Sequence, residues 1–351
     1  MRSLWGKAPF RFEMRDVPTP EPGPGEVRVR VTACGICGTD LHLLRHNTEW
    51  TPLGHEVVGV VDAVGPFVSG WYGGEAVIVE NHTGCGVCAE CKNGRARYCR
   101  NLTTYMHDRA GFADYLRVRA DMVQPYDAQA LAPQQAALSE PLTVALDLLQ
   151  RADPEFNDEV AVFGHGSIGL MTARLAKLRG ARRVFLTGSS RVTQHSRHRL
   201  AVGQQMGADV TLSEGEDDIA AAIKAAVPQG VDRVLITAPP RTLPLAFEIA
   251  RFGAIIGLIG IEFGAGGEVN FDVNAFHFKK LQLRASHAIP NHYFPVATDL
   301  LARRAIDPDL LLSHTFALDA YAAAFAALTD PEQAVVQVVL IPRGTVRPDG
   351  T

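Results

Sequence analysis

A glycine-rich turn near the middle of the chain constrains its fold more than any other stretch. The apolar run 160–163 is typical of a short buried strand, and residues 168–178 have the spacing of an amphipathic helix. The pattern GxGxxG is weak evidence alone. Between a strand and a helix it predicts a tight turn whose backbone a pyrophosphate can approach. We expect a dinucleotide to contact the residues of this turn, namely Gly164, Gly166, Ser167, Ile168 and Gly169.

The alternation of strand and helix continues towards the C-terminus. Short apolar runs are separated by helical stretches near 195–206, 217–226 and 242–251. This order predicts a parallel, doubly wound sheet. A tail follows, with helices expected near 293–304 and 319–329. The expected strands are 184–187, 210–212, 233–237, 254–259, 281–285 and, in the tail, 335–341.

The first part of the chain has a different pattern. Residues 26–32 alternate valine with polar residues, as a strand with one buried face does. Residues 56–65 and 76–80 are rich in β-branched side chains. The first 120 residues therefore predict an antiparallel, all-β domain, and a chain of 351 residues is long enough for two domains.

All six cysteines lie between positions 34 and 99. A secreted disulfide scaffold would spread them through a short chain, so this cluster indicates metal binding. Four thiolates with the spacing of Cys85, Cys88, Cys91 and Cys99 can surround one tetrahedral zinc ion and leave no open position. This set predicts a structural zinc site.

A second possible metal site lies earlier in the chain. It offers a thiol (Cys37), a hydroxyl (Thr39), two imidazoles (His42 and His55) and a carboxylate (Glu56). Zinc accepts sulfur, nitrogen and oxygen donors, and a catalytic site keeps one position open, so Cys37, His55 and Glu56 suit such a site. Taken alone, the stretch is more simply a buried cysteine and two ordinary histidines. The cysteine set and the glycine turn favour the metal.

Charge and hydropathy argue against several classes of protein. A net charge of −4 gives no general attraction to nucleic acid or to an anionic membrane. The N-terminus lacks the apolar region of a secretory signal, and no apolar run is long enough for a membrane span, so we expect a cytoplasmic protein. A zinc ribbon that binds nucleic acid is the alternative from another class. It would need a larger basic surface than Lys92, Arg95, Arg97 and Arg100 provide.

Together these motifs resemble the zinc-dependent medium-chain dehydrogenases, which include alcohol, sorbitol, threonine and glucose dehydrogenases. Zinc-free quinone reductases of the same superfamily lack both metal sets, which this chain retains. The matching segments are Gly35–His42, Gly54–Glu56, the four-cysteine set, Gly111–Tyr115, Glu140–Leu142 and the glycine turn.

The resemblance implies an α/β chain with a GroES-like β-barrel catalytic domain over residues 1–150, which includes the structural-zinc lobe. A Rossmann domain would occupy 151–289, and 290–351 would return to the catalytic domain. The implied reaction is hydride transfer between a nicotinamide cofactor and a small secondary alcohol, polyol or sugar-type substrate. Simple alcohols or aldehydes and amino alcohols of the threonine type are alternative substrates. A homodimer or homotetramer is expected.

The resemblance also implies roles for residues of the first metal site. Cys37 and His55 would bind catalytic zinc. Simple alcohol dehydrogenases of the family use another cysteine as third ligand. Because the rest of this chain has none, an oxygen ligand or water is expected there. Glu56 and Glu140 are the candidates, and Cys34 competes with them because Cys34 and Cys37 have the spacing of a ligand pair.

Thr39 and His42 are implied in proton transfer. Thr39 would take the proton of the substrate and pass it through the cofactor ribose to His42 at the surface. The simpler alternatives are a hydroxyl that caps a loop for Thr39 and an exposed helix residue for His42.

The cofactor preference is predicted from the end of the second Rossmann strand. A NAD enzyme carries an Asp or Glu there, which binds the ribose 2′-hydroxyl and would repel a 2′-phosphate. This chain has Gly188, Ser189, Ser190 and Arg191 instead, and two hydroxyls and a guanidinium can bind phosphate. We therefore predict NADP, with NAD as the alternative. A further departure from the family is Gln337, where a lysine is common.

Overall fold

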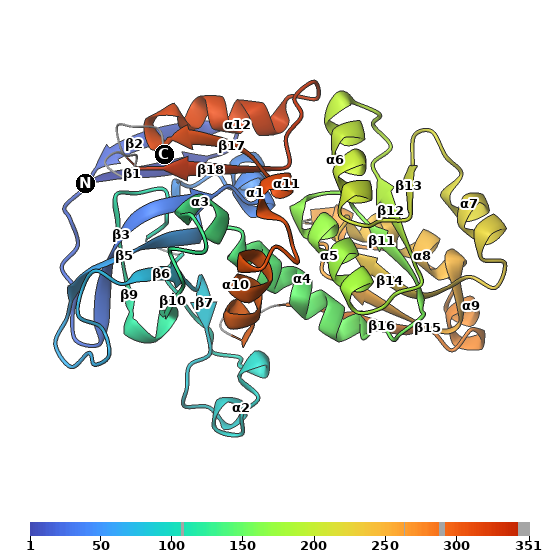
Figure 1. Ribbon diagram of the computed structural model, residues 1–351, viewed down its shortest axis with the longest axis horizontal. Helices are drawn as coiled ribbons and strands as arrows, with labels where there is room; N and C mark the ends of the chain where they lie inside the picture. The colour runs from blue at the N-terminus through green and yellow to red at the C-terminus, as the bar shows by residue number, and fades with distance from the viewer. Residues whose placement is uncertain (107–108, 263, 288–291, 343–351) are drawn as a thin grey trace. The chain divides into compact units, whose positions relative to one another are not determined.

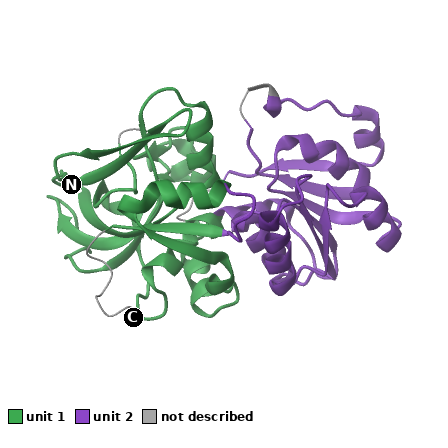
Figure 2. Cartoon of the chain, turned by 90° about the horizontal axis from the view of Figure 1, so that it is seen from above, with its two compact units in different colours: residues 1–143, 289–329, 337–351 green, residues 144–288, 330–336 purple. Residues whose placement is uncertain are grey.

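The computed structural model describes residues 1–106, 109–262, 264–287 and 292–342. The chain forms two compact units (Figure 2). Unit 1 comprises residues 1–143, 289–329 and 337–351, and unit 2 comprises residues 144–288 and 330–336.

The two units divide the chain at different residues from the predicted domains 1–150, 151–289 and 290–351. The first division falls inside α4 (Ser139–Ala152), so this helix contributes to both units. The second difference is the segment 330–336, which belongs to unit 2 and not to the returning tail. Helix α6 (Gln194–Gln205) holds this segment, because Arg199 Nε donates a hydrogen bond of 2.8 Å to the backbone carbonyl of Val335.

Unit 1 is built around a seven-stranded sheet that contains the long strand β3 (Glu26–Gly35) (Figure 1). In β3, Val27, Val29 and Val31 are at most 1% exposed and the arginines between them are half-buried, as the alternation predicts. Strand β18 (Gln337–Ile341) comes from the far end of the chain and pairs with β3. The other strands of this sheet are β5 (Glu56–Val64), β6 (Ala76–Val79), β9 (Tyr115–Arg119), β10 (Val123–Pro125) and β17 (Leu312–Ala317). Outside it lie β1 (Arg2–Lys7), β2 (Arg11–Asp16), β4 (Thr51–Pro52), β7 (His82–Thr83) and β8 (Thr103–Thr104).

The all-β prediction for the first 120 residues is wrong at α1 (Gly38–His46). Cys37 is the N-cap of this helix, and the Asp40 side chain accepts a hydrogen bond of 2.9 Å from the Cys37 backbone N–H. The sequence also fails to predict β17, because no residue of that strand is fully buried and its apolar pattern is weak. The remaining helices of unit 1 are α2 (Ala89–Lys92), α3 (Pro133–Ala136), α10 (Phe294–Ala302), α11 (Pro308–Leu311), α12 (Tyr321–Thr329), η1 (Ala96–Tyr98), η2 (Ala120–Met122) and η6 (Leu318–Ala320).

Unit 2 contains a six-stranded parallel sheet, which confirms the predicted doubly wound architecture (Figure 1). The strands lie in the order β13 (Val210–Ser213), β12 (Arg183–Gly188), β11 (Glu159–Phe163), β14 (Val231–Ile236), β15 (Ala250–Leu258) and β16 (Gln282–Ala285). The helices are α5 (Ser167–Leu178), α6, α7 (Ile219–Ala226), α8 (Leu243–Ile249), α9 (Val273–Phe278), η3 (Pro240–Thr242) and η4 (Gly264–Gly267).

Helices cover both faces of this sheet. Ala161 and Phe163 of β11 share a buried apolar cluster with side chains of α7 and α8. Successive side chains of a strand point to opposite faces, so Val162 faces the other way. On that other face α6 packs closely, because a Cβ at Gly203 would lie 2.2 Å from Leu186 of β12. Within the described part of the chain, no helix is long and apolar enough to cross a membrane.

Candidate active site

The ends of two paired strands bring the first set of donor atoms together. Strands β3 and β5 are antiparallel, with Gly35 opposite Glu56, so the residues just beyond this pair lie close to each other. One donor atom each of Cys37, His55 and Glu56 lies within 4.8 Å of the other two. A thiolate, an imidazole and a carboxylate at this separation fit one zinc ion with an open position.

The buried carboxylate of Asp40 fixes both loops that carry these donors. It accepts hydrogen bonds from the backbone N–H groups of Cys37 (2.9 Å) and Gly54 (3.0 Å). The same carboxylate lies 3.8 Å from Nδ1 of His55, which is within reach of a charge interaction but beyond a hydrogen bond. Asp40 was not among the site residues predicted from the sequence. The available signal was its position three residues after Cys37, where the acceptor of a capping box is found.

Glu56 is held by the C-terminal strand. Gln337 Nε2 donates hydrogen bonds to Glu56 Oε2 (2.7 Å) and to the backbone carbonyl of Ile36 (3.2 Å). Gly35 leaves the space for this carboxylate, because a Cβ there would lie 1.9 Å from Glu56 Oε2. A lysine at position 337 would place a positive charge beside Glu56. The neutral amide of Gln337 leaves the negative charge of Glu56 to the metal site.

Glu140 lies beside this cluster but does not join it. Its carboxylate accepts a hydrogen bond of 2.7 Å from Asn81 Nδ2, a buried partner that the sequence analysis missed. Among the described residues, the donors that converge within 4.8 Å include neither Glu140 nor Cys34. The Cys34 Sγ packs against Gly111 instead, where a Cβ would lie 2.8 Å from the sulfur. The geometry therefore favours Glu56 as the third donor.

Burial and negative charge control the protonation of the cluster. Burial raises the pKa of the Cys37 thiol to about 12, and the nearby carboxylates of Glu140 and Asp40 add to the effect. Burial also raises the pKa of Glu56 well above its usual value, with Cys37 as the next cause. For His55, burial acts to lower the pKa, but the surrounding carboxylates, Asp40 first, outweigh it and raise the pKa. Nearby acidic groups contribute to all three upward shifts, so the site is electronegative, and a divalent cation would offset this negative charge.

Thr39 and His42 lie on α1, next to the donor cluster. Thr39 is exposed, and its Oγ1 is 3.7 Å from the Cys37 Sγ. His42 is half-buried and stacks on the ring of His46, with 5.8 Å between the ring centroids. Residues three positions apart share one face of a helix, so Thr39 and His42 form a short path away from the cluster.

The four predicted structural ligands also converge. One sulfur each of Cys85, Cys88, Cys91 and Cys99 lies within 4.8 Å of the others. Hydrogen bonds from the backbone N–H groups of Val87 and then Cys88 lower the pKa of Cys85 to about 6. Four sulfurs in this arrangement fit a closed tetrahedral zinc site.

Each glycine of the glycine-rich turn has its own reason to lack a side chain. Gly164 has a φ of +107°, and a Cβ there would lie 2.5 Å from Thr237 Oγ1. A Cβ at Gly169 would lie 1.9 Å from the Gly164 carbonyl oxygen, so this residue allows α5 to pack on the turn. A Cβ at Gly166 would meet no atom within 4 Å, so the backbone is open there for a ligand.

A cavity of about 260 Å³ lies at this turn, at the carboxyl ends of the parallel strands. Of the predicted contacts, Gly164, Gly166, Gly188 and Ser189 line it. Ser167 and Ile168 begin α5, and Ser190 and Arg191 are exposed outside the lining.

His165 also lines the cavity. Its Nε2 lies 3.0 Å from Ser196 Oγ, which connects the turn to α6. Burial, then the charge of Arg199, lowers the pKa of His165 to about 4, so the imidazole is neutral at pH 7.

Two charged residues that were not predicted from the sequence also line this cavity. Glu214 follows β13 and Arg241 lies in η3, so the residues are far apart in the chain. Arg241 Nη1 and Glu214 Oε1 are 3.2 Å apart. Strand β12 ends without an acidic residue, but Glu214 supplies one at the end of the neighbouring strand β13, where it pairs with Arg241.

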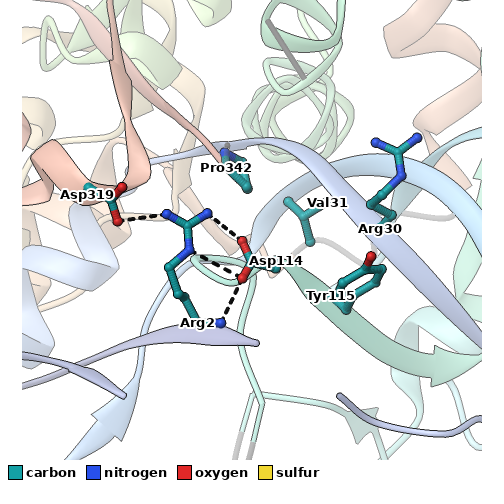
Figure 3. A pocket seen from close by; sticks show the side chains of 7 residues that line it. All are labelled: Arg2, Arg30, Val31, Asp114, Tyr115, Asp319 and Pro342. Atoms are coloured by element: carbon teal, nitrogen blue, oxygen red, sulfur yellow. Dashed lines mark hydrogen bonds and ion pairs between the residues drawn. The ribbon is translucent and has the colours of Figure 1, made fainter. Parts of the chain in front are cut away.

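A larger hollow, of about 560 Å³, lies on unit 1 (Figure 3). Its charged groups mainly pair with one another: the guanidinium of Arg2 lies 2.6 Å from Asp114 and 2.7 Å from Asp319. None of the metal-ligand candidates lines it, so we assign it no part in the chemistry.

Comparison with known proteins gives two family matches. Residues 23–128 match the family model of the alcohol dehydrogenase GroES-like domain, and residues 167–303 match that of the zinc-binding dehydrogenases. Both expected domain types are confirmed.

Relatives match over almost the whole chain. L-threonine 3-dehydrogenase of Pyrococcus furiosus is 32% identical over 91% of this chain and 92% of its own. A crystal structure of a dehydrogenase (rspB) from Escherichia coli CFT073 with NADH is 29% identical, with a TM-score of 0.87 over 97% of this chain and 99% of its own. A putative zinc-binding dehydrogenase from Sinorhizobium meliloti 1021 bound to NADP is 31% identical, with a TM-score of 0.85 over 97% and 99%.

Proposed function

The chain belongs to the zinc-binding alcohol dehydrogenase family of oxidoreductases, which use zinc and a nicotinamide dinucleotide, and on this premise we propose that it acts on a secondary alcohol or polyol with NADP. A sugar-type substrate belongs to the same proposed class. The observation that carries this proposal is the convergence of Cys37, His55 and Glu56 within 4.8 Å, with His55 and Glu56 buried and Cys37 half-buried.

In this proposal Cys37, His55 and Glu56 hold the catalytic zinc, and Cys85, Cys88, Cys91 and Cys99 hold the structural zinc. Bound at the first site, zinc supplies a Lewis acid for the oxygen of an alcohol or carbonyl group. Glu140 acts as an alternative ligand or holds the surrounding hydrogen bonds through Asn81.

The proton of the substrate hydroxyl leaves through α1 in this proposal. Thr39 Oγ1 accepts it next to the cluster, and His42, one turn along the same helix, exchanges it with solvent.

NADP is proposed as the preferred cofactor because β12 ends without an acid. Gly188 and Ser189 line the cavity, and a larger residue at 188 would crowd Leu200, where a Cβ would lie 3.2 Å from a methyl carbon. One solved relative was crystallised with NADP and another with NADH, so both cofactors occur among similar proteins.

A threonine-type amino alcohol is the second candidate substrate. The relative from Pyrococcus furiosus is an L-threonine 3-dehydrogenase, and threonine carries a secondary hydroxyl, so this reading keeps the same reaction class.

The test is a substrate panel on zinc-loaded protein. Polyols, aldoses, simple alcohols and L-threonine are compared by kcat/KM with NADP and with NAD. A polyol, sugar or secondary alcohol with NADP is the expected best pair, and L-threonine as best substrate would favour the second candidate. Cys37→Ser should remove one zinc per chain and turnover, whereas Cys34→Ser should keep both. Loss of zinc in the Cys34 variant alone would overturn the ligand assignment.

A further inference from the structure

The dinucleotide cavity contains an ion pair that neither the glycine turn nor the end of β12 explains. Among the described residues that line it, Glu214 is the only acid and Arg241 the only lysine or arginine. Both side chains remain partly open to solvent, Glu214 at 35% and Arg241 at 56% exposure. A ligand in the cavity can therefore reach them.

The structure fixes Glu214 close to the residues that follow β12. Gly188 is paired with Ser213 at the end of the parallel strands, and Ser213 Oγ donates a hydrogen bond of 3.2 Å to the Ser189 carbonyl. A Cβ at Gly215 would lie 2.3 Å from the Ser190 carbonyl oxygen, so the two turns touch through their backbones. Glu214 thus stands where the cofactor ribose is expected in a fold of this type.

Arg241 is positioned, and Arg191 is not. Arg241 lies in η3 beside Pro239 and Pro240, whose rings restrict the backbone, and Thr242 hydrogen-bonds the Pro239 carbonyl. Its guanidinium uses Nη1 for Glu214 and has further donors. Arg191 is exposed as Arg241 is, but among the residues that the structure describes no ion pair holds its guanidinium.

We propose that Arg241, held by Glu214, is the specificity-determining cation that binds the 2′-phosphate of NADP. The inference rests on the proposed preference for NADP. Without Arg241 the carboxylate of Glu214 would face the phosphate and repel it, as the acid of a NAD enzyme does. With Arg241 in place, one guanidinium bridges the carboxylate and the phosphate through different N–H groups. The guanidinium of Arg191 then adds positive charge near the 2′-phosphate but is not held in one position by an ion pair.

The test compares dissociation constants of NADP and NAD on the zinc-loaded enzyme. Arg241→Ala should raise the dissociation constant of NADP by roughly 10- to 100-fold, the equivalent of one charge-assisted hydrogen bond. The dissociation constant of NAD should change by less than about twofold. Glu214→Gln added to Arg241→Ala should recover part of the NADP affinity, because the repelling charge is gone. Arg197→Ala is the matched control. It breaks an exposed pair with Glu216 of similar length, 3.0 Å, outside the cavity, and should change neither constant.

The outcomes separate this inference from the proposed function. If the wild type prefers NADP and Arg241→Ala leaves the preference unchanged, the inference is wrong and the proposed function stands. An equal loss of both cofactors would show a role in general dinucleotide binding and would also overturn it. If the wild type prefers NAD, the proposed cofactor and the inference both fall. Binding of NAD by each variant verifies that it is folded.

Discussion

At the scale of single residues, Asp40 has the largest unrecognised effect on the candidate metal site. Its carboxylate accepts hydrogen bonds from the backbone N–H groups of Cys37 and Gly54 and lies 3.8 Å from Nδ1 of His55. Asp40→Asn keeps the size of the side chain but replaces one acceptor oxygen with a donor, so one of the two backbone hydrogen bonds is lost. We expect roughly 10- to 100-fold weaker binding of the catalytic zinc, with the four-cysteine zinc retained.

Metal analysis after dialysis against a weak chelator measures this effect, with Asp62→Asn as control. Asp62 is an exposed aspartate that pairs with Arg28 on the same sheet. Two tightly held zinc ions per chain in the Asp40 variant would refute the positioning role.

Glu80 makes stability depend on pH. This side chain is fully buried, and burial raises its pKa to about 8, since hydrogen bonds with Thr83 and Gln124 offset only part of the effect. In the unfolded chain its pKa is near 4.5. Between these values the folded protein binds more protons than the unfolded chain, so the free energy of unfolding falls as pH rises.

The slope from Glu80 is at most about 1.4 kcal/mol per pH unit between pH 5 and 8. This contribution of Glu80 should lower the midpoint of thermal unfolding of the zinc-loaded protein as pH rises, whereas His165, whose pKa is lowered, contributes with the opposite sign below about pH 6.5. Glu80→Gln should flatten this dependence, whereas Glu13→Gln on the exposed strand β2 should leave it unchanged. Parallel curves for wild type and Glu80→Gln would contradict the assignment.

At the scale of elements, the junction of β11 and α5 contains two glycines whose substitution should affect different properties, stability for Gly169 and cofactor binding for Gly166. Gly169→Ala would force a Cβ against the Gly164 carbonyl, so it should lower the free energy of unfolding by about 1–3 kcal/mol, as overpacking does. Gly166→Ala meets no protein atom and should change stability by less than about 0.5 kcal/mol. Gly166→Ala should still weaken the binding of NADP and of NAD to the same extent, because the added methyl group lies where the pyrophosphate is expected to approach the backbone.

Denaturant unfolding and cofactor titration separate these two effects. Unchanged cofactor binding in Gly166→Ala would show that the pyrophosphate lies elsewhere.

Spacing along the chain was enough to predict the elements that carry local motifs. The four cysteines, the glycine turn, and Cys37 with His55 and Glu56 are grouped where they were expected. Helix α1 and strand β17 were missed for different reasons. Helix α1 was missed because the capping box of Cys37 and Asp40 was not recognised as a helix start. Strand β17 was missed because too few of its side chains are buried to give a periodic apolar pattern.

At the scale of the whole molecule, the contacts that sequence could not predict are those between distant segments. Gln337 reaches Glu56 only because β18 pairs with β3. Arg241 meets Glu214 only because the residues after β14 and β13 lie at the same carboxyl edge of the parallel sheet, where the two side chains reach each other. No local period encodes such a pair. The missed acid in the dinucleotide cavity therefore comes from a neighbouring strand and not from the expected position in the chain.

The expected homo-oligomer stays a prediction, and the sheet of unit 2 indicates where a second copy would bind. Strand β16 is an edge of the sheet, and an exposed edge can pair with another strand. Leu283 on β16 is 40% exposed, and Phe252 and Phe278 of neighbouring elements are 63% and 72% exposed. An apolar edge of this kind is unusual for a surface that stays in water.

We therefore expect the purified protein to be a dimer or tetramer whose copies meet at β16. Leu283→Lys places a charge on the edge strand, a change that disfavours strand pairing between chains, so it should shift the protein towards the monomer. Tyr72→Lys is the control, because Tyr72 is 88% exposed and belongs to unit 1, whereas β16 belongs to unit 2. Light scattering coupled to size-exclusion chromatography gives the masses. A monomeric wild type would refute the oligomer, and an unchanged oligomer in Leu283→Lys would place its interface on another surface.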